Sequence, residues 1–135
     1  MNRMDFFEKV ILGGTDALQK SLDAYHRNTR QMILTNTRIS AFRYYDGPLI
    51  ADMLETGLLL RLSREPGNRF DPQAVEVYAG DAKLGYISHT ENSSIAWLMD
   101  TGIWVKARIT SLFHDDPFNV SVEIEVWHER EAARN

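Results

Sequence analysis

An aromatic ring and a carboxylate stand side by side at Phe70-Asp71, inside the stretch REPGNRFDPQAVEV that runs from Arg64 to Val77. Proline, glycine and asparagine are frequent here and apolar runs flank the stretch, which predicts a loop between two strands. Loops on a rigid scaffold often carry recognition residues. The ring can stack on a flat ligand while the carboxylate accepts a hydrogen bond from a hydroxyl group. The pair therefore favours binding of a carbohydrate, a nucleotide or a nucleic-acid end.

A second aromatic cluster, Phe42-Arg43-Tyr44-Tyr45, precedes this loop at the end of another predicted strand. Both clusters also have structural explanations. Asp71 can fix the turn by accepting backbone N–H bonds, and Phe70 can fill the core. Arg64-Glu65 is expected to form a solvated local ion pair. At the level of sequence, the structural and the functional interpretations both stay open.

Motifs for catalysis or metal binding are missing from the sequence. The chain has no cysteine, which excludes disulfides, thiolate metal sites and a cysteine nucleophile. Its four histidines show neither an i, i+4 pair nor the HExxH spacing of zinc sites. The GxSxG, P-loop and GxGxxG patterns are absent as well. We therefore expect a protein that is not an enzyme and needs no cofactor or metal.

The charge balance limits how the chain could bind nucleic acid. Fifteen basic and nineteen acidic residues give a net charge of −4, whereas proteins that hold duplex backbone carry a basic face. Any nucleic-acid binding must therefore come from a local pocket. No apolar run reaches the roughly 20 residues of a membrane span, and acidic residues interrupt the apolar stretch near the N-terminus. We expect a soluble, intracellular and cytoplasmic protein without membrane contact.

The apolar pattern predicts a mainly β protein of the α+β class, with an OB-like or SH3-like small barrel of about six strands. One helix is inserted between strands at Ser88–Met99, where Ile95, Leu98 and Met99 form an apolar stripe before Gly102. A short helical turn is expected over Ile50–Leu54. The predicted strands cover residues 37–42, 57–62, 74–78, 83–87, 103–113 and 118–127.

The N-terminal part follows a different pattern. Met4–Gln31 is predicted to be helical and is interrupted at Gly13-Gly14. We expect an N-terminal helical segment over residues 1–35, the barrel over residues 36–128 and a flexible tail over residues 129–135.

Three runs, FRYYDG, LRLSREPGNRFDPQAVEVYAGDAKLGYI and IAWLMDTG, resemble the HIRAN domain. The similarity covers about Asn36–Trp127, and its most specific part is the loop pattern R-[DE]-P-x-N-x-[FY]-D-x-x-A followed by G-[YH]-[IL]. The resemblance implies a modified OB-type barrel, in agreement with the strand pattern. It also implies capture of the 3′-hydroxyl end of single-stranded DNA. Such domains occur fused to helicase-like enzymes and as free-standing small proteins.

The resemblance assigns roles to individual residues. Asp71 would accept a hydrogen bond from the terminal hydroxyl and repel a 3′-phosphate, while Tyr44 and Phe70 would stack on the last bases. Arg43 would pair with a backbone phosphate. The remaining residues of the expected DNA-binding site are Tyr45, Tyr86, His89 and Phe118.

The chain departs from the family pattern after the glycine-aromatic strand. His89 stands where a lysine would hold phosphate, and a histidine side chain is largely neutral at pH 7. Arg64, Arg69 and Lys83 are the nearby basic candidates that could replace it.

Two classes of function remain. The first is a non-catalytic module for single-stranded DNA 3′-hydroxyl ends, which acts in DNA repair or replication stress with a helicase or nuclease partner. The second is a protein-interaction adaptor with a vestigial pocket, which forms homo-oligomers through its N-terminal segment. A weaker third interpretation is a nuclease-like enzyme, which would require magnesium-dependent cleavage that depends on Asp71.

Overall fold

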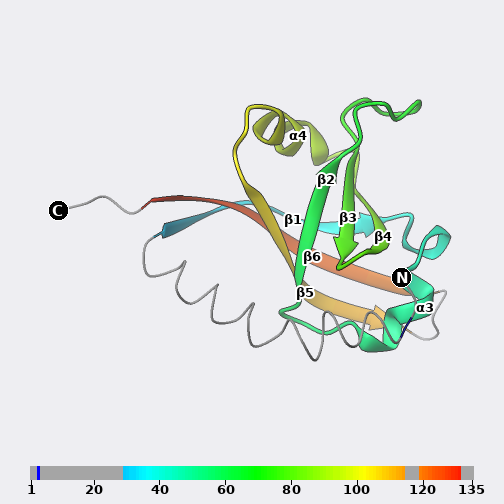
Figure 1. Ribbon diagram of the computed structural model, residues 1–135. Helices are drawn as coiled ribbons and strands as arrows, with labels where there is room; N and C mark the ends of the chain where they lie inside the picture. Colours follow the sequence, from blue (N-terminus) through cyan, green and yellow to red (C-terminus); the bar gives the residue numbers. More distant parts are fainter. Residues whose placement is uncertain (1–2, 4–28, 115–118, 132–135) are drawn as a thin grey trace.

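The computed structural model describes residue 3, residues 29–114 and residues 119–131 of the 135-residue chain. These residues form a closed antiparallel barrel with the strand order β1-β4-β3-β2-β5-β6 (Figure 1). The predicted mainly β barrel is therefore confirmed. Its strands are β1 (Thr29–Ser40), β2 (Leu59–Arg64), β3 (Val75–Ala79), β4 (Ala82–Ile87), β5 (Val105–His114) and β6 (Val120–Glu131).

Short helices occupy two of the connections. The 3₁₀ helix η2 (Phe42–Tyr44), α3 (Gly47–Ile50) and the 3₁₀ helix η3 (Ala51–Met53) follow β1, and α4 (Asn92–Asp100) lies between β4 and β5. The helix inserted between strands is thus where the sequence predicts it, as is the short helical turn before β2. Within the described part of the chain, no helix has both the length and the apolarity to cross a bilayer.

The two predicted hairpins are present. β3 pairs with β4 around a tight turn at Gly80-Asp81, and β5 pairs with β6 along almost its whole length. Gly80 has φ 59°, a left-handed conformation that glycine adopts without strain. The alternation of apolar side chains located these strands because one face of each strand points into the barrel.

β1 and β6 are longer than the sequence predicts. Residues 29–35, which were expected to be helical, pair with β6 from Thr29↔Glu131 onward. The expectation was wrong for these residues, because a strand partner nearly a hundred positions away satisfies their backbone groups. Residues 129–131 likewise belong to β6, and the indole of Trp127 donates a hydrogen bond to the buried Glu129 carboxylate at 2.7 Å. The other residues of the predicted helical segment and tail, 1–2, 4–28 and 132–135, lie outside the described residues.

The barrel interior is filled by apolar side chains from all six strands, and α4 covers one end of it (Figure 1). Ile95 and Ala96 of α4 are buried in this core. Two glycines permit close approach. A Cβ atom on Gly47 would overlap the ring of Phe42, and one on Gly85 would overlap the carbonyl oxygen of Ser40 in β1. The second contact, at the β1–β4 crossing, fixes the strand that carries Tyr86.

Candidate nucleic-acid interface

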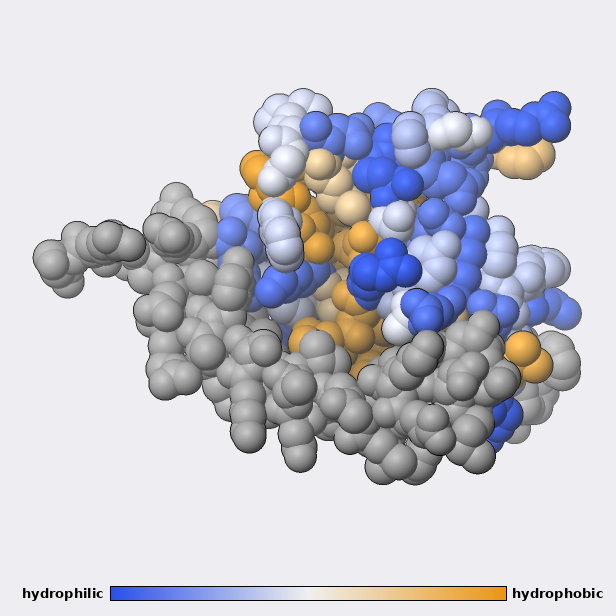
Figure 2. All heavy atoms as spheres, in the orientation of Figure 1, coloured by the Kyte–Doolittle hydropathy of each residue, from blue (hydrophilic) through white to orange (hydrophobic). Residues whose placement is uncertain are grey.

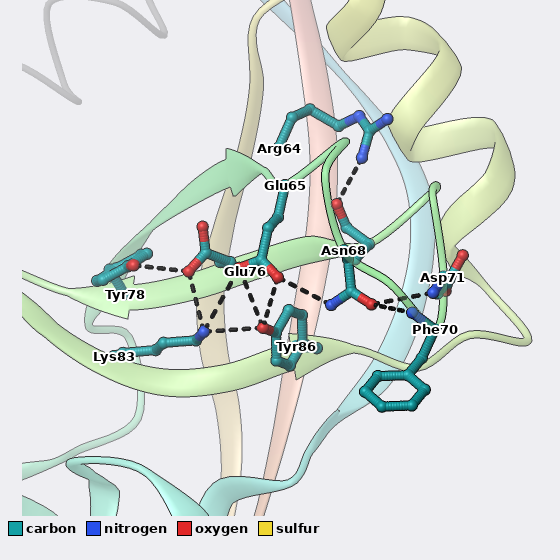
Figure 3. Close-up of polar contacts among 10 residues, drawn as sticks. Arg64, Glu65, Asn68, Phe70, Asp71, Glu76, Tyr78, Lys83 and Tyr86 are labelled. Carbon is teal, nitrogen blue, oxygen red and sulfur yellow. Dashed lines mark hydrogen bonds and ion pairs between the residues drawn. The ribbon is translucent and has the colours of Figure 1, made fainter.

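The loop between β2 and β3 is organised by Asn68. Its Oδ1 atom accepts hydrogen bonds from the backbone N–H groups of Phe70 and Asp71, both at 2.9 Å. Its Nδ2 atom donates to Oε1 of Glu65 at 2.8 Å. These bonds hold the backbone of the aromatic-carboxylate pair in one conformation (Figure 3). Sequence reasoning did not identify Asn68 or Glu65 as site residues, although both belong to the R-[DE]-P-x-N part of the loop pattern.

Arg64 closes the same loop from its other side. Its guanidinium donates to the carbonyl oxygens of Ala74 and Pro72 and pairs with Asp100 of α4 at 2.9 Å. The expected local ion pair between Arg64 and Glu65 is replaced by these separate contacts, because successive side chains of an extended strand point to opposite faces. Arg64 is therefore a structural residue whose charge is already compensated.

Asp71 is held by two donors. Its Oδ1 atom accepts the backbone N–H of Gln73 at 2.9 Å, and its Oδ2 atom accepts Nδ2 of Asn92 at 2.7 Å. Asn92 is 2% exposed and is the first residue of α4. The turn-forming role expected for Asp71 is thus present. Each carboxylate oxygen has a second lone pair, so the side chain keeps the capacity to accept a hydroxyl hydrogen.

Two aromatic rings of the predicted site are exposed. Phe70 is 98% exposed and Tyr44 is 75% exposed, so Phe70 does not fill the core. Figure 3 shows the Phe70 ring projecting from the loop, away from the polar contacts of Glu65 and Asn68. The Arg43 guanidinium lies 5.5 Å from the centroid of the Tyr44 ring, which suits a cation–π contact. These rings are free to stack on a ligand.

Tyr45 and Tyr86 form a more sheltered part of the site. Their ring centroids are 5.7 Å apart in an edge-to-face arrangement. The turn that carries Tyr45 is tied to β4, because Oδ2 of Asp46 accepts the backbone N–H of Lys83 at 3.0 Å and the N–H of Asp46 donates to the Lys83 carbonyl at 2.9 Å. The structure therefore brings the second aromatic cluster against the strand that carries Tyr86.

Lys83 is the centre of a charged network that includes Glu65, Glu76 and Tyr86 (Figure 3). Its Nζ atom donates to the Tyr86 hydroxyl at 2.8 Å and pairs with Glu76 at 3.0 Å and Glu65 at 3.7 Å. It also lies 4.2 Å from the Tyr45 ring centroid and 4.4 Å from that of Tyr86. The Lys83 side chain is 18% exposed. The residue expected as a substitute phosphate ligand is therefore already engaged by two carboxylates.

The network changes the titration of its members. Burial opposes the Lys83 charge, but hydrogen bonds to Tyr86 and Glu76 and the Glu76 charge outweigh it and raise the pKa of Lys83. Burial, together with hydrogen bonds involving Tyr45 and Glu65, raises the pKa of Tyr86 to about 12. For Glu65, burial favours the neutral form, yet hydrogen bonds from Asn68 and Tyr86 lower the pKa below its usual value. The ammonium and the Glu65 carboxylate are thus charged at neutral pH, and the Tyr86 phenol is protonated.

The structure describes three of the four remaining candidate residues, and all three are at the surface. His89 and Arg69 are exposed, as is Arg43. Phe118 lies outside the described residues. Among the residues that the structure describes, no group of three histidine or acidic side chains could hold a metal ion.

A separate apolar groove lies on another face of the barrel. The β2–β5 ladder is confined to Leu59↔Arg108 and Leu60↔Ala107, and beyond it the strands diverge beneath α4. A cavity of about 530 Å³ opens there, lined by apolar side chains that include Leu62 and Met99. Figure 2 shows this hollow with an apolar floor between more polar walls. None of the expected DNA-binding residues lines it.

Comparison with known proteins places the chain in a family. The HIRAN domain family model matches residues 33–129, and the chain belongs to this family. A crystal structure of a protein from Lactobacillus plantarum is similar at 30% identity with a TM-score of 0.67, covering 76% of this chain and 98% of that one. The crystal structure of the HIRAN domain of human HLTF shares the fold, with 16% identity, a TM-score of 0.58 and coverage of 73% and 78%. A search of curated proteins gave no match.

Proposed function

We propose that this chain is a non-catalytic module that binds the free 3′-hydroxyl end of single-stranded DNA. The observation that carries the proposal is the combination of a fixed carboxylate, Asp71, with two exposed rings, Phe70 and Tyr44. Membership of the HIRAN family supports it, since the resemblance implies this ligand.

Asp71 gives the proposed site its chemical selectivity. Asn92 and the Gln73 backbone hold its carboxylate, so no conformational freedom is lost when a hydroxyl group binds. The same carboxylate repels a terminal phosphate, because two like charges at close range destabilise each other. The module therefore discriminates between a 3′-hydroxyl and a 3′-phosphate.

Stacking supplies most of the affinity in this proposal. Tyr44 and Phe70 each stack on a base, at about 1–3 kcal/mol per base and with little sequence preference. Arg43 pairs with a phosphate near the end, and Tyr45 and Tyr86 line the wall. The family resemblance also assigns His89 and Phe118 to the site, although Phe118 lies outside the described residues. Because Lys83 is paired with glutamates, few phosphates are neutralised on binding. We therefore expect modest affinity with a shallow salt dependence.

Within this proposal, the biological role is in DNA repair or replication stress. A module without catalytic groups needs a partner that supplies activity, and we propose a helicase or a nuclease as that partner.

The proposal is tested by fluorescence anisotropy with short single-stranded DNAs that end in a 3′-hydroxyl or a 3′-phosphate. Tighter binding of the hydroxyl end, with binding of both ends weakened in Tyr44→Ala and in Arg43→Ala, supports the proposal. Equal binding of both ends, or binding that ignores the Tyr44 substitution, contradicts it.

The groove between β2 and β5 favours a second candidate, protein binding. Trp104 at its rim is 76% exposed, and the edge of β2 beyond Leu60 has no β5 partner, which suits an extended peptide that adds a strand. Arg61 in its lining favours acidic residues in that peptide. Selection from a random peptide display library on this protein, with counter-selection on Trp104→Ala, tests the candidate. Enrichment of alternating apolar and acidic peptides supports it, and peptides that bind both proteins equally contradict it.

A further inference from the structure

We propose that Glu65 and Glu76 reinforce the selectivity that Asp71 gives the proposed site by neutralising Lys83, so that removing one of these carboxylates turns Lys83 into a ligand for a terminal phosphate. This inference rests on the proposed function, because it concerns the same DNA-end site. It assigns to two acidic residues outside the expected DNA-binding set a specific role in rejecting charged ends.

Lys83 lies close to two rings of the proposed site. Its ammonium lies within 4.4 Å of the ring centroids of both Tyr45 and Tyr86, which are the sheltered rings of the site. The cation is therefore part of the wall of the site. A cation at this position would ordinarily attract the phosphates of a bound strand.

The ammonium group of Lys83 is already surrounded by oxygen atoms of the protein. An ammonium group has three N–H donors. Tyr86 takes one at 2.8 Å, Glu76 lies 3.0 Å away and Glu65 lies 3.7 Å away. The three oxygens come from three different segments, namely β4, β3 and the residue after β2. Two of the donors thus have acceptors within hydrogen-bonding distance, and a phosphate that approached the third would still meet the Glu65 carboxylate.

The cluster around Lys83 carries more negative than positive charge. Two carboxylates surround one ammonium, so the cluster has a net charge of about −1 at neutral pH, when all three groups are ionised. Glu65 is also fixed by the hydrogen bond from Asn68, so its carboxylate stays beside the ammonium. An incoming phosphate therefore meets an excess of negative charge around the only lysine in this network.

Glu76→Gln is the cleaner variant because Glu76 lies within β3, whereas Glu65 also accepts the hydrogen bond from Asn68 that holds the recognition loop. The amide keeps an acceptor oxygen for the Tyr78 hydroxyl, which now donates to Glu76 at 2.7 Å. Removing the charge leaves Lys83 with only Glu65 as a counter-ion. We expect the affinity for a 3′-phosphate end to rise about tenfold relative to a 3′-hydroxyl end. The slope of log affinity against log salt should steepen by about 0.7, the value for one more phosphate contact with a single strand.

The experiment is fluorescence anisotropy of the full chain with both DNA ends at two salt concentrations. Glu55→Gln, which removes one exposed carboxylate in the turn before β2, is the matched charge control. Lys83→Met combined with Glu76→Gln must abolish the gain, because a purely structural effect of Glu76 would persist without the ammonium. Thermal unfolding verifies that each variant is folded, and Glu65→Gln serves as the second variant if Glu76→Gln does not fold.

A gain in 3′-phosphate binding that depends on Lys83 supports the inference. If the unsubstituted protein prefers hydroxyl ends and neither glutamine variant changes that preference, the inference is wrong while the proposed function stands. If the unsubstituted protein binds neither end, the proposed function fails and the inference fails with it.

Discussion

Asp71→Asn is the substitution that separates the two roles of the recognition carboxylate. The variant keeps an acceptor oxygen for a terminal hydroxyl but loses the charge that repels a phosphate. A carboxylate and a phosphate charge about 4 Å apart interact by about 1 kcal/mol in water and about 4 kcal/mol near a protein surface. Asp71 is partly buried, so the repulsion falls between these limits. It corresponds to a hydroxyl preference of roughly fivefold to several hundredfold, which the variant should largely lose.

The structural role of Asp71 gives this prediction its control. The carboxylate offers acceptors to both Gln73 and Asn92, whereas an amide offers only one oxygen. Because Asn92 is 2% exposed, loss of its acceptor costs at most about 1–3 kcal/mol of folding free energy. Urea unfolding measures that cost. The ratio of the two end affinities is independent of it, because both ends are titrated against the same folded fraction.

Anisotropy titrations of both proteins with 3′-hydroxyl and 3′-phosphate strands supply the ratio, and Glu55→Gln controls for the change in net charge. Retention of the full hydroxyl preference by Asp71→Asn would refute the reasoning, since it would show that another group rejects the phosphate.

Further predictions concern the rings, the strand crossing and the acid response. Tyr44→Ala and Phe70→Ala should each weaken DNA binding by about 1–3 kcal/mol in anisotropy while leaving thermal unfolding almost unchanged, because both rings are largely exposed; a large loss of stability would contradict this. Gly85→Ala should destabilise the barrel severely in urea unfolding, because the added Cβ overlaps a β1 carbonyl oxygen at a φ of 140°; stability like that of the unsubstituted protein would show that β1 can move. The lowered pKa of Glu65 means that its stabilisation is present above its unfolded pKa, near 4.5, and is lost as pH falls through the lower folded value. Glu65→Gln should therefore reduce the loss of stability between neutral pH and pH about 4 or below, measured by urea unfolding at each pH; an unchanged acid response would exclude Glu65 as a contributor.

The barrel was largely predictable from local patterns. Alternating apolar residues located five of the strands to within a few positions, and the Gly80-Asp81 turn and the apolar stripe around Ile95 marked a hairpin and α4. These signals are local because side-chain direction alternates along each strand. The first seven residues of β1 were missed, because their strand conformation depends on pairing with β6 at the other end of the chain.

The loop that carries Phe70 and Asp71 was predictable from its residue pattern, but the electrostatics of the proposed site were only partly predictable. The exposure of Tyr44 and Phe70 agrees with a recognition role for both. Lys83 was expected to be a candidate phosphate ligand, and nothing in the sequence indicates that Glu65 and Glu76 lie on either side of its ammonium. Such partners come from separate strands, and their register is set by the whole barrel. The hydrogen bond from Asn92 to Asp71 could not be predicted from the sequence for the same reason, because the two residues come from different segments of the barrel.

The central claim is that the site recognises a free 3′-hydroxyl end. The most direct test compares the affinities of the unsubstituted full chain for two single strands of the same sequence, one ending in a 3′-hydroxyl and the other in a 3′-phosphate. Anisotropy at low and moderate salt should show tighter binding of the 3′-hydroxyl strand at both concentrations, with a shallow salt dependence. Equal affinity for the 3′-phosphate strand, or no binding of either strand, would contradict the claim.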